Sequence, residues 1–432
     1  MVIVGALLIL VFTLIIGVSV PFAFLASVTS IVFIYDYDPS FLLPYGYSRL
    51  NNIVLLAIPL FIISGGLINK SHIGNKLVDL VELFVGHIKG GLGAATVVSS
   101  AVFGALTGSA SATLSAIGSI MFPRLADSGY PVGHSAALVA NASVLGLLIP
   151  PSALMILYAW VGNQSVLASF LACFIPGIIV TVLLCVVNYA LLKNNREMRV
   201  EPALSGKVFV QEFRRRGVMA IPALAMPMLI LGGIYGGFVT PTEAAALSVL
   251  YVLPVGYFIY RELNRKTLWD AFLEAAITTG IVMMMLYCVM ILSRLYIMED
   301  LPGMILDFFN SMSVSPLVIL LLINLVMIVI GMLMDDVSAV LLATPLLLPL
   351  ALELGVSGTQ FAAVVGVNLG MGNITPPTAP LLYLSGQLSG ASIKDTMRPT
   401  LYMIGFAWLP TLMLVTFVPE VSLWLPRLFG LH

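Results

Sequence analysis

The chain has 432 residues, of which 60% are hydrophobic and only 9% are charged. Soluble globular domains carry about 25% charged residues, so this composition excludes an ordinary soluble protein and predicts an all-α, polytopic membrane protein. The net charge of −1 gives no reason to expect a nucleic-acid partner. The cysteines Cys173, Cys185 and Cys288 stand singly in apolar segments, which favours neither a disulfide framework nor a metal site.

The first half of the chain is predicted to cross the membrane five times. The crossings are expected at 1–16, 22–34, 51–69, 134–162 and 166–192. The first two are separate helices because Gly-Val-Ser-Val-Pro (17–21) interrupts the apolar run, and about 20 residues suffice to cross a bilayer. Asp36, Asp38 and Arg49 indicate a loop before the third crossing. The amphipathic stretch 70–89 is expected to lie flat at the membrane surface.

Residues 90–127 are expected to form a re-entrant hairpin with two short arms rich in small residues. The arms are joined by a tip of sequence Thr-Gly-Ser-Ala-Ser (107–111), which a water-facing loop would not need. Non-helical backbone at membrane depth is tolerated only where it is buried in protein or lines a cavity. The tip is therefore a candidate wall of a binding site.

The segment 193–216 is predicted to be a cytoplasmic linker, because it is rich in lysine and arginine and ends in Arg214-Arg215-Arg216. A second half of the same plan follows over 217–432. It is expected to hold spans near 217–236, 241–260, 271–297, 360–384 and 399–419, a surface stretch at 298–312, and a second hairpin at 315–354 with its tip at 334–338.

The two halves are related by an internal duplication. Sliding 141–158 by 226 positions lays Pro150-Pro151-Ser152 on Pro376-Pro377-Thr378 and Gly146 on Gly372. The hairpins align at an offset of 227. Five crossings are an odd number, so the repeats 1–192 and 217–432 are expected to be inverted, with the first hairpin opening to the cytoplasm and the second to the outside. The hairpins and the broken spans 134–162 and 360–384 are expected to form a transport domain, and the other spans a scaffold.

Interrupted helices at corresponding places in two halves point to a binding site at the membrane midplane, where hydroxyls, amide oxygens and freed carbonyls hold Na⁺. At least two Na⁺ sites are therefore expected. The candidate ligands are Ser109, Ser111, Asn141, Gly146 and Pro150 in the first half, and Asp336, Ser338, Asn368, Gly370, Gly372 and Thr375 in the second. The alternative is that the small residues among these candidates only allow membrane helices to pack closely. Either Asp335 or Asp336 is the carboxylate that faces the ion, and the sequence does not decide between them.

Ser152, Asn373, Thr378 and Arg294 are the candidates for binding a substrate carboxylate. The helices that leave the tips would point their N-termini, with free N–H groups and a positive dipole end, at such an anion. For Arg294 the alternative is an interfacial side chain that reaches toward the membrane surface. Glu243 is expected to cap a helix, because Thr240-Pro241-Thr242-Glu243 is a capping box.

Five sequence motifs together resemble the large membrane subunit of tripartite ATP-independent periplasmic (TRAP) transporters. They are Gly104–Ala112 with Gly-Ser-Ala-Ser-Ala, Asn141–Ser152 with Ile-Pro-Pro-Ser, the Gly-Gly-Phe-Val-Thr-Pro-Thr-Glu-Ala-Ala run at 236–245, Gly331–Ala339, and Asn368–Tyr383 with Thr-Pro-Pro. The resemblance covers essentially the whole chain.

The resemblance implies a secondary transporter of the bacterial inner membrane that is driven by Na⁺ and works by an elevator mechanism. It also implies a periplasmic binding protein that delivers an organic acid, and a small four-helix membrane subunit, expected here as a separate chain. Members carry sialic acid, C4-dicarboxylates or other carboxylates, and the sialic-acid type is the interpretation favoured here. The alternative is a stand-alone Na⁺/dicarboxylate symporter or ion antiporter of similar two-hairpin plan.

Overall fold

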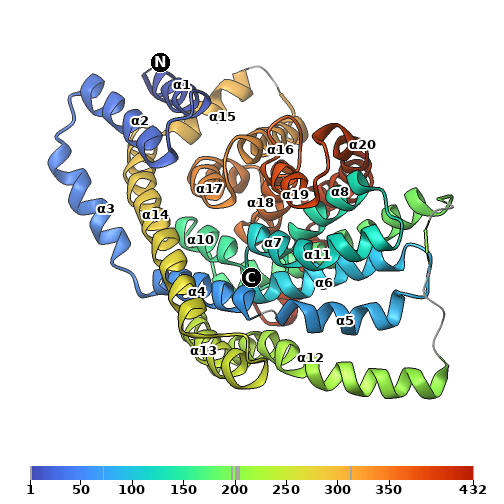
Figure 1. Ribbon diagram of the computed structural model, residues 1–432. Helices are drawn as coiled ribbons and strands as arrows, with labels where there is room; N and C mark the ends of the chain where they lie inside the picture. Colours follow the sequence, from blue (N-terminus) through green and yellow to red (C-terminus); the bar gives the residue numbers. More distant parts are fainter. Residues whose placement is uncertain (1, 72, 196–197, 200–204, 312–313, 432) are drawn as a thin grey trace.

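The computed structural model describes residues 2–71, 73–195, 198–199, 205–311 and 314–431, and every regular element in these ranges is helical (Figure 1). Eight of the described helices are long and apolar enough to cross a membrane, or nine if one bent pair is counted as a single span. The predicted fold class, an all-α polytopic membrane protein, is confirmed.

The N-terminal part begins with two short helices, as expected. Its helices are α1 (Val2–Ile15), α2 (Val20–Tyr35), α3 (Leu42–Leu50), α4 (Ala57–Lys70) and α5 (Ile73–Val85). The turn between α1 and α2 contains Gly17 with φ +86°. The hydroxyl of Ser27 in α2 donates to the carbonyl of Ala6 in α1 (3.0 Å), so the two helices pack together.

The prediction of a loop before the third crossing was wrong in part, because α3 occupies residues 42–50 and packs against α14 (Arg265–Met298). Pro44 and Gly46 favour turns in sequence, but proline is tolerated in the first turn of a helix. Gly46 lets the helix approach α14, since a Cβ there would lie 2.8 Å from the Tyr287 ring. Arg49 lies in the last turn of α3.

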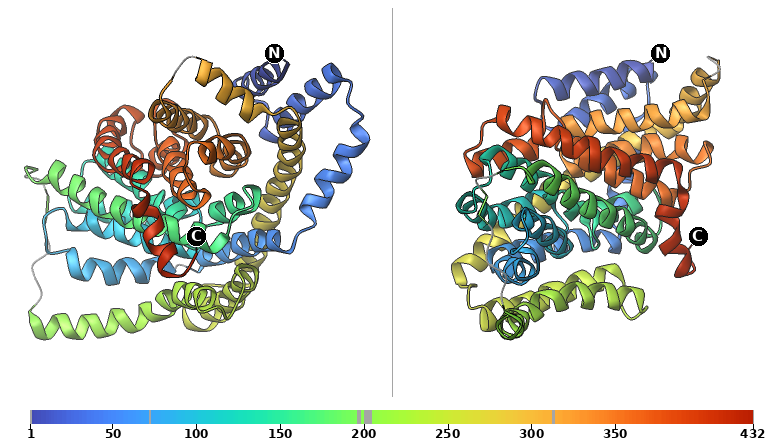
Figure 2. Two further views of the ribbon diagram at one scale, coloured as in Figure 1. Left: turned by 180° about the vertical axis from the view of Figure 1, so that it is seen from behind. Right: turned by 90° about the vertical axis from the view of Figure 1, so that its right-hand side faces the viewer.

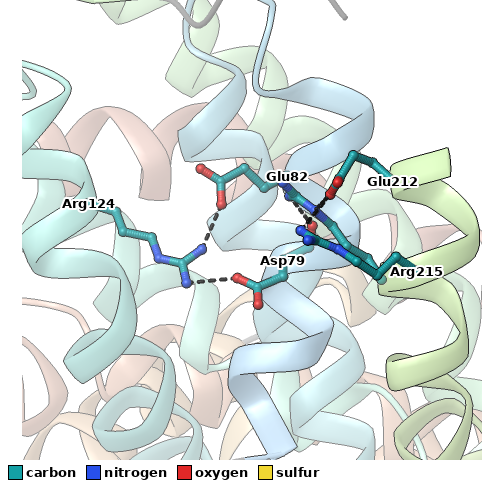
Figure 3. A network of polar contacts seen from close by, with 6 residues as sticks. Asp79, Glu82, Arg124, Glu212 and Arg215 are labelled. Atoms are coloured by element: carbon teal, nitrogen blue, oxygen red, sulfur yellow. Dashed lines mark hydrogen bonds and ion pairs between the residues drawn. The ribbon is translucent and has the colours of Figure 1, made fainter. Parts of the chain in front are cut away.

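Helix α5 does not lie on a free surface but packs against α6 (Gly91–Thr107) and α12 (Gly206–Tyr235). Its acidic residues take part in a polar network drawn in Figure 3. The guanidinium of Arg124 pairs with Asp79 (2.8 Å) and with Glu82 (2.6 Å). Arg216 of α12 donates to the backbone carbonyl of Asp79 (2.8 Å). The charged face of α5 therefore joins the first hairpin to α12.

The described part of the second half is built from the helices α12 to α22. Its helices are α12, α13 (Pro241–Pro254), α14, α15 (Leu301–Ser311), α16 (Pro316–Leu333), α17 (Asp336–Glu353), α18 (Gly358–Gly372), α19 (Pro380–Ser389), α20 (Ile393–Met403), α21 (Leu409–Phe417) and α22 (Pro419–Leu428). A π-helical turn extends α13 over Val255–Ile259, and another joins α20 to α21. Gly237, before α13, has φ +71° and corresponds to Gly17. The capping box expected at Thr240 and Glu243 is present.

Several boundaries differ from those predicted, and α14 begins at Arg265 rather than at 271. Of the linker expected over 193–216, residues 196–197 and 200–204 lie outside the described part, and residues from Gly206 onward already belong to α12. The last span begins at 393 rather than 399, because Ser392 caps α20 and its hydroxyl accepts a hydrogen bond from the Asp395 N–H. Residue 312, at the end of the expected surface stretch, is also outside the described residues.

The centre of the molecule is formed by the paired helices α6–α7 and α16–α17 and by the helices that follow them (Figures 1 and 2). All 15 residues of α18 are buried, as expected for a helix that is covered on every side. Helix α10 (Ala153–Val161) of the first half packs against α17, and α19 of the second packs against α7 (Ala110–Asp127). Helices α2, α3, α14, α4, α13 and α12 run around one side of this centre, and α22 packs on α11 (Val166–Leu192).

Candidate functional site

The first tip joins α6 to α7 at Gly108, which has φ +62°. Ser109 caps α7, and its side-chain oxygen accepts a hydrogen bond from the Ala112 N–H (3.4 Å). The Ser109 and Ser111 hydroxyl oxygens are 3.2 Å apart. Thr113 donates to the Ser109 carbonyl (2.7 Å), and its hydroxyl lies 3.1 Å from that of Thr107. The tip thus gathers several neutral oxygen atoms at the N-terminus of an 18-residue helix.

The first broken span consists of α8 (Val132–Ser143), α9 (Leu145–Leu148) and α10, with a bend of 47° at the break. The peptide bond between Pro150 and Pro151 in the break is cis. A Cβ on Gly104 of α6 would lie 2.7 Å from the nitrogen of Gly146, so both glycines are required for this close approach. A Cβ on Gly146 would lie 2.9 Å from the Thr113 hydroxyl oxygen. Gly146 therefore lies beside the tip, as predicted.

The other candidates of the first half have different surroundings. Asn141 is fully buried, and its side-chain oxygen accepts a hydrogen bond from the indole N–H of Trp408 (3.1 Å). This oxygen thus already accepts one hydrogen bond from a residue of the second half. Pro150 and Ser152 are buried in the break, and the Ser152 hydroxyl has no hydrogen-bond partner among the described residues. A buried, unpaired hydroxyl is costly unless a ligand or water satisfies it.

The second tip joins α16 to α17, and its two aspartates have separate roles. Asp335 caps α17, accepting hydrogen bonds from the N–H groups of Val337 (3.2 Å) and Ser338 (3.4 Å). The Ser338 hydroxyl also donates to Asp335. Asp336 instead accepts a hydrogen bond from the side-chain amide of Asn373, in the second broken span. Asp336 is therefore the aspartate that reaches the break.

The second break, between α18 and α19, also contains a cis peptide bond, between Pro376 and Pro377. A Cβ on Gly372 would lie 2.7 Å from the Cα of Gly331 in α16, so this contact repeats the one between Gly104 and Gly146. Thr378 donates to the carbonyl of Met332 near the tip. Asn373 and Thr378 thus both attach the break to the second hairpin.

Of three further candidates in the second half, Asn368 and Gly370 are buried in α18, whereas Thr375 lies in the break. The amide of Asn368 donates to the side chain of Asn324 (2.8 Å), while its own buried side-chain oxygen has no partner among the described residues. Thr375, half-buried in the break, donates to the Met371 carbonyl near the end of α18 (2.6 Å). A Cβ on Gly370 would lie 2.5 Å from a methyl of Val144, so the structure gives Gly370 a packing role between the two broken spans.

A cavity of about 330 Å³ lies beside the first tip. Its lining comes from the tip, from the start of α10, and from α4 and α14: Ile62, Gly65, Gly66, Asn69, Thr107, Gly108, Ser109, Ser111, Ala112, Ser115, Ala153, Ala271, Glu274, Ala275 and Thr278. Glu274 pairs with Lys70 (2.8 Å) at this wall. The second tip instead contacts α14, where Ser338 lies 3.1 Å from the sulfur of Met285.

Sequence reasoning missed the α4 and α14 wall of this cavity. The only local signal was the run of small residues, Gly65-Gly66 in α4 and Ala271 and Ala275 in α14, one helical turn apart. Arg294 lies on α14 well beyond the cavity, and its exposed guanidinium sits over the Tyr45 ring at 5.5 Å. The structure therefore does not bring Arg294 together with Ser152, Asn373 or Thr378.

Two helix pairs whose tips meet two interrupted helices, one pair in each half, are the arrangement in which secondary transporters build their binding sites. Residues 5–421 match the family described as "Tripartite ATP-independent periplasmic transporter, DctM component". The chain belongs to this family and is a multi-pass protein of the inner membrane. The resemblance seen in the motifs is thereby confirmed.

Relatives of similar length support the same assignment. The chain is 35% identical to "Uncharacterized protein YgiK" of Salmonella typhimurium, over 97% of this chain and 96% of that protein. It is 34% identical to the C4-dicarboxylate TRAP transporter large permease protein DctM of Pseudomonas aeruginosa, over 87% of both chains. It is 32% identical to the sialic acid TRAP transporter large permease protein SiaM of Vibrio cholerae, over 88% of both chains.

Among solved structures, the crystal structure of the Alcanivorax borkumensis YdaH transporter matches 88% of this chain and 88% of its own, with a TM-score of 0.59 and 15% identity. At that identity the likeness concerns the fold alone. The chain therefore shares its helical architecture with a protein solved as a transporter.

Proposed function

We propose that this chain is the large membrane subunit of a Na⁺-coupled uptake system for an organic acid. The observation that carries the proposal occurs once in each half: a hairpin tip with hydroxyl groups lies beside a Pro-Pro break. Gly104 and Gly146 allow this close approach in the first half, and Gly331 and Gly372 allow it in the second. Interrupted helices of this kind hold Na⁺ with freed carbonyls and bind anions at helix N-termini.

Two Na⁺ ions are proposed as co-transported cargo, one at each tip. The first would take oxygen atoms of Ser109, Ser111 and the backbone near Gly146, and the unpaired hydroxyl of Ser152 lies in the same break. The second would take the Asp336 carboxylate together with the Asn368 oxygen, which is buried without a partner among the described residues. Asp336 is half-buried at the start of α17, and ionisable residues within membrane-spanning segments mark ion pathways.

The repeats 1–192 and 217–432 are proposed to be inverted, with re-entrant hairpins at 90–127 and 315–354. The hairpins and broken spans would move as one transport domain against a scaffold that includes α4 and α14, as in an elevator. The cavity supports this division, because it lies between the first tip and these two helices. The second tip contacts α14 at Met285, whereas the cavity lies at the first tip. In this proposal the structure therefore corresponds to the state in which the site is open to the cytoplasm, the side to which the first hairpin opens.

The substrate is proposed to be a carboxylate that binds in the cavity with its anionic group at the N-terminus of α7. Relatives named for C4-dicarboxylate and for sialic acid have nearly equal identity, so both substrates belong in the test. A small four-helix membrane subunit, as a separate chain, and a periplasmic binding protein are proposed as partners, in keeping with a tripartite family.

Reconstitution in proteoliposomes tests this function. The chain and its small subunit are expected to take up a carboxylate from a panel only when an inward Na⁺ gradient and a cognate binding protein are both supplied. Uptake without the binding protein would instead favour a stand-alone symporter or antiporter. Uptake that is independent of the Na⁺ gradient would contradict the proposal.

A further inference from the structure

A second hollow lies far from the tips, where three helices end on one side of the molecule. It has a volume of about 690 Å³ and is bounded by the start of α8, the end of α11 and the start of α20. Its lining residues are Pro131, Val132, Gly133, His134, Leu191, Leu192, Lys394, Asp395, Arg398, Pro399 and Tyr402. None of these residues lines the cavity at the first tip.

Helices α8 and α20 pack closely against each other, and the start of α8 meets α20 beside the hollow. A Cβ on Gly133 would lie 2.5 Å from the carbonyl oxygen of Asp395, so only glycine permits this crossing. Pro399, four residues later, has no N–H to bond that carbonyl within the helix. The hollow lies beside this contact, between the starts of α8 and α20 and the end of α11.

The hollow lies where two candidate membrane spans have their ends, and such ends mark the boundary between water and hydrocarbon. The candidate span Val166–Leu192 ends there, and the candidate span 393–417 begins there. Lys394 and Arg398 are exposed within the first six residues of the second span. Under the proposed topology this side faces the cytoplasm, where basic pockets between membrane helices bind lipid head groups.

Charge and apolar surface occur together on α20. Lys394 and Arg398 lie one turn apart, and Arg398 stands 6.0 Å from the Tyr402 ring centroid. The only carboxylate in the lining, Asp395, is engaged with the Ser392 hydroxyl (2.7 Å) in the cap of α20. An adjoining hollow of about 390 Å³ continues past Met397 and Leu401, both exposed, toward the middle of the span.

We propose that Lys394 and Arg398 bind the phosphate of an acidic glycerophospholipid, whose acyl chains lie on Met397, Leu401 and Tyr402 of α20. Two cations one turn apart complement a phosphodiester, and guanidinium groups bind phosphate oxygens through paired N–H donors. The apolar surface continues along the helix toward the membrane interior, which suits a lipid better than a soluble phosphate compound.

Native mass spectrometry of the full chain, purified with its small subunit in neutral detergent, tests this site with phosphatidylglycerol and phosphatidylcholine. Phosphatidylglycerol is expected to bind preferentially, and the variant K394Q/R398Q is expected to lose at least fivefold of that binding. The conservative variant K394R/R398K should retain it. The matched control R265Q/K266Q removes two exposed cations at the start of α14, on the same proposed side, and should leave binding unchanged.

Several results would overturn the site. The first two are equal binding of the two lipids and undiminished binding of phosphatidylglycerol by K394Q/R398Q. The third is an equal loss of binding in the R265Q/K266Q control. The fourth is displacement of the lipid by millimolar glycerol phosphate, which would indicate a soluble phosphate ligand. If K394Q/R398Q does not fold, the single variant R398Q keeps Lys394 and the apolar wall. It should then show a clear partial loss, and full retention would equally reject the proposal.

Discussion

The side-chain amide of Asn373 donates a hydrogen bond to the carboxylate of Asp336 and so fastens the second break to the second hairpin. The neighbouring Asp335 instead caps α17 and accepts from the Ser338 hydroxyl. If Na⁺ binds at Asp336, replacing Asp336 with Asn should weaken Na⁺ activation strongly while the protein still assembles. The Na⁺ concentration for half-maximal uptake measures this, and an unchanged value would remove Asp336 from the site.

Asn373 provides a milder test of the same site. It is proposed to orient the Asp336 carboxylate, and loss of a partner that orients a metal ligand costs about 10- to 100-fold in affinity. Asn373→Ala should therefore raise the half-activating Na⁺ concentration by about tenfold. Asp335→Ser, which preserves a capping oxygen, serves as the control and should have little effect on Na⁺ activation.

Gly104 and Gly146 should not tolerate a side chain. A methyl group at Gly104 would meet the backbone of Gly146 at 2.7 Å, and backbone cannot move aside as a flexible side chain can. Gly104→Ala is expected to lower stability by about 1–3 kcal/mol or more. Gly232→Ala in α12, where nothing lies within 4 Å, should be neutral or slightly stabilising. Thermal unfolding of the purified proteins compares them, and equal melting temperatures would contradict the packing argument.

The ion pair at the cavity wall should affect anion transport more than stability. Side chains of Lys70 and Glu274 are 31% and 62% exposed, and such pairs contribute about 0–1 kcal/mol to folding. Lys70→Ala would leave the Glu274 carboxylate unpaired beside the proposed substrate and should raise the KM for a carboxylate several-fold. Lys70→Ala/Glu274→Gln should restore it, because the repulsion is removed. A KM that stays high in the double variant would show that Lys70 acts in another way.

Arg124 should matter for stability because one guanidinium serves two acids on α5 (Figure 3). The partners are partly buried, so Arg124→Ala is expected to destabilise the protein by about 1–2 kcal/mol, as removal of a hydrogen-bonded charge does. Arg215→Ala removes an exposed pair with Glu212 within one helix and should cost about 0.5 kcal/mol or less. Melting temperatures of the two variants, measured side by side, test this difference. Equal melting temperatures would show that the Arg124 network does not stabilise the fold.

Much of the helical plan could be predicted from sequence, because the residues that interrupt the helices are recognisable locally. Pro150-Pro151 and Pro376-Pro377 interrupt long apolar runs, and the small residues of the first tip stand out against them. The internal duplication also helped, because a pattern seen in one half supported the interpretation of the same pattern in the other half. Helix α3 was missed because Pro44 and Gly46 resemble turn residues, whereas contact with Tyr287 of α14, far along the chain, makes them helical.

The directions of side chains could not be predicted. Asn141 and Asn368 lie just before the two breaks, one position out of register at the offset of 226, yet the Asn141 oxygen accepts from Trp408 and the Asn368 amide donates to Asn324. These contacts come from tertiary packing between distant segments. The same reason hid the cavity wall, since Gly65 and Ala271 are separated from the tip in sequence and meet it only in the folded protein.

The opposite orientation of the two repeats can be measured directly by labelling the tips. In a chain without its native cysteines, S111C and D335C each place one thiol at an exposed tip residue. A membrane-impermeant thiol reagent is then added to right-side-out or inside-out vesicles. The inverted arrangement predicts that S111C reacts only in inside-out vesicles and D335C only in right-side-out vesicles. Reaction of both from the same side would contradict it.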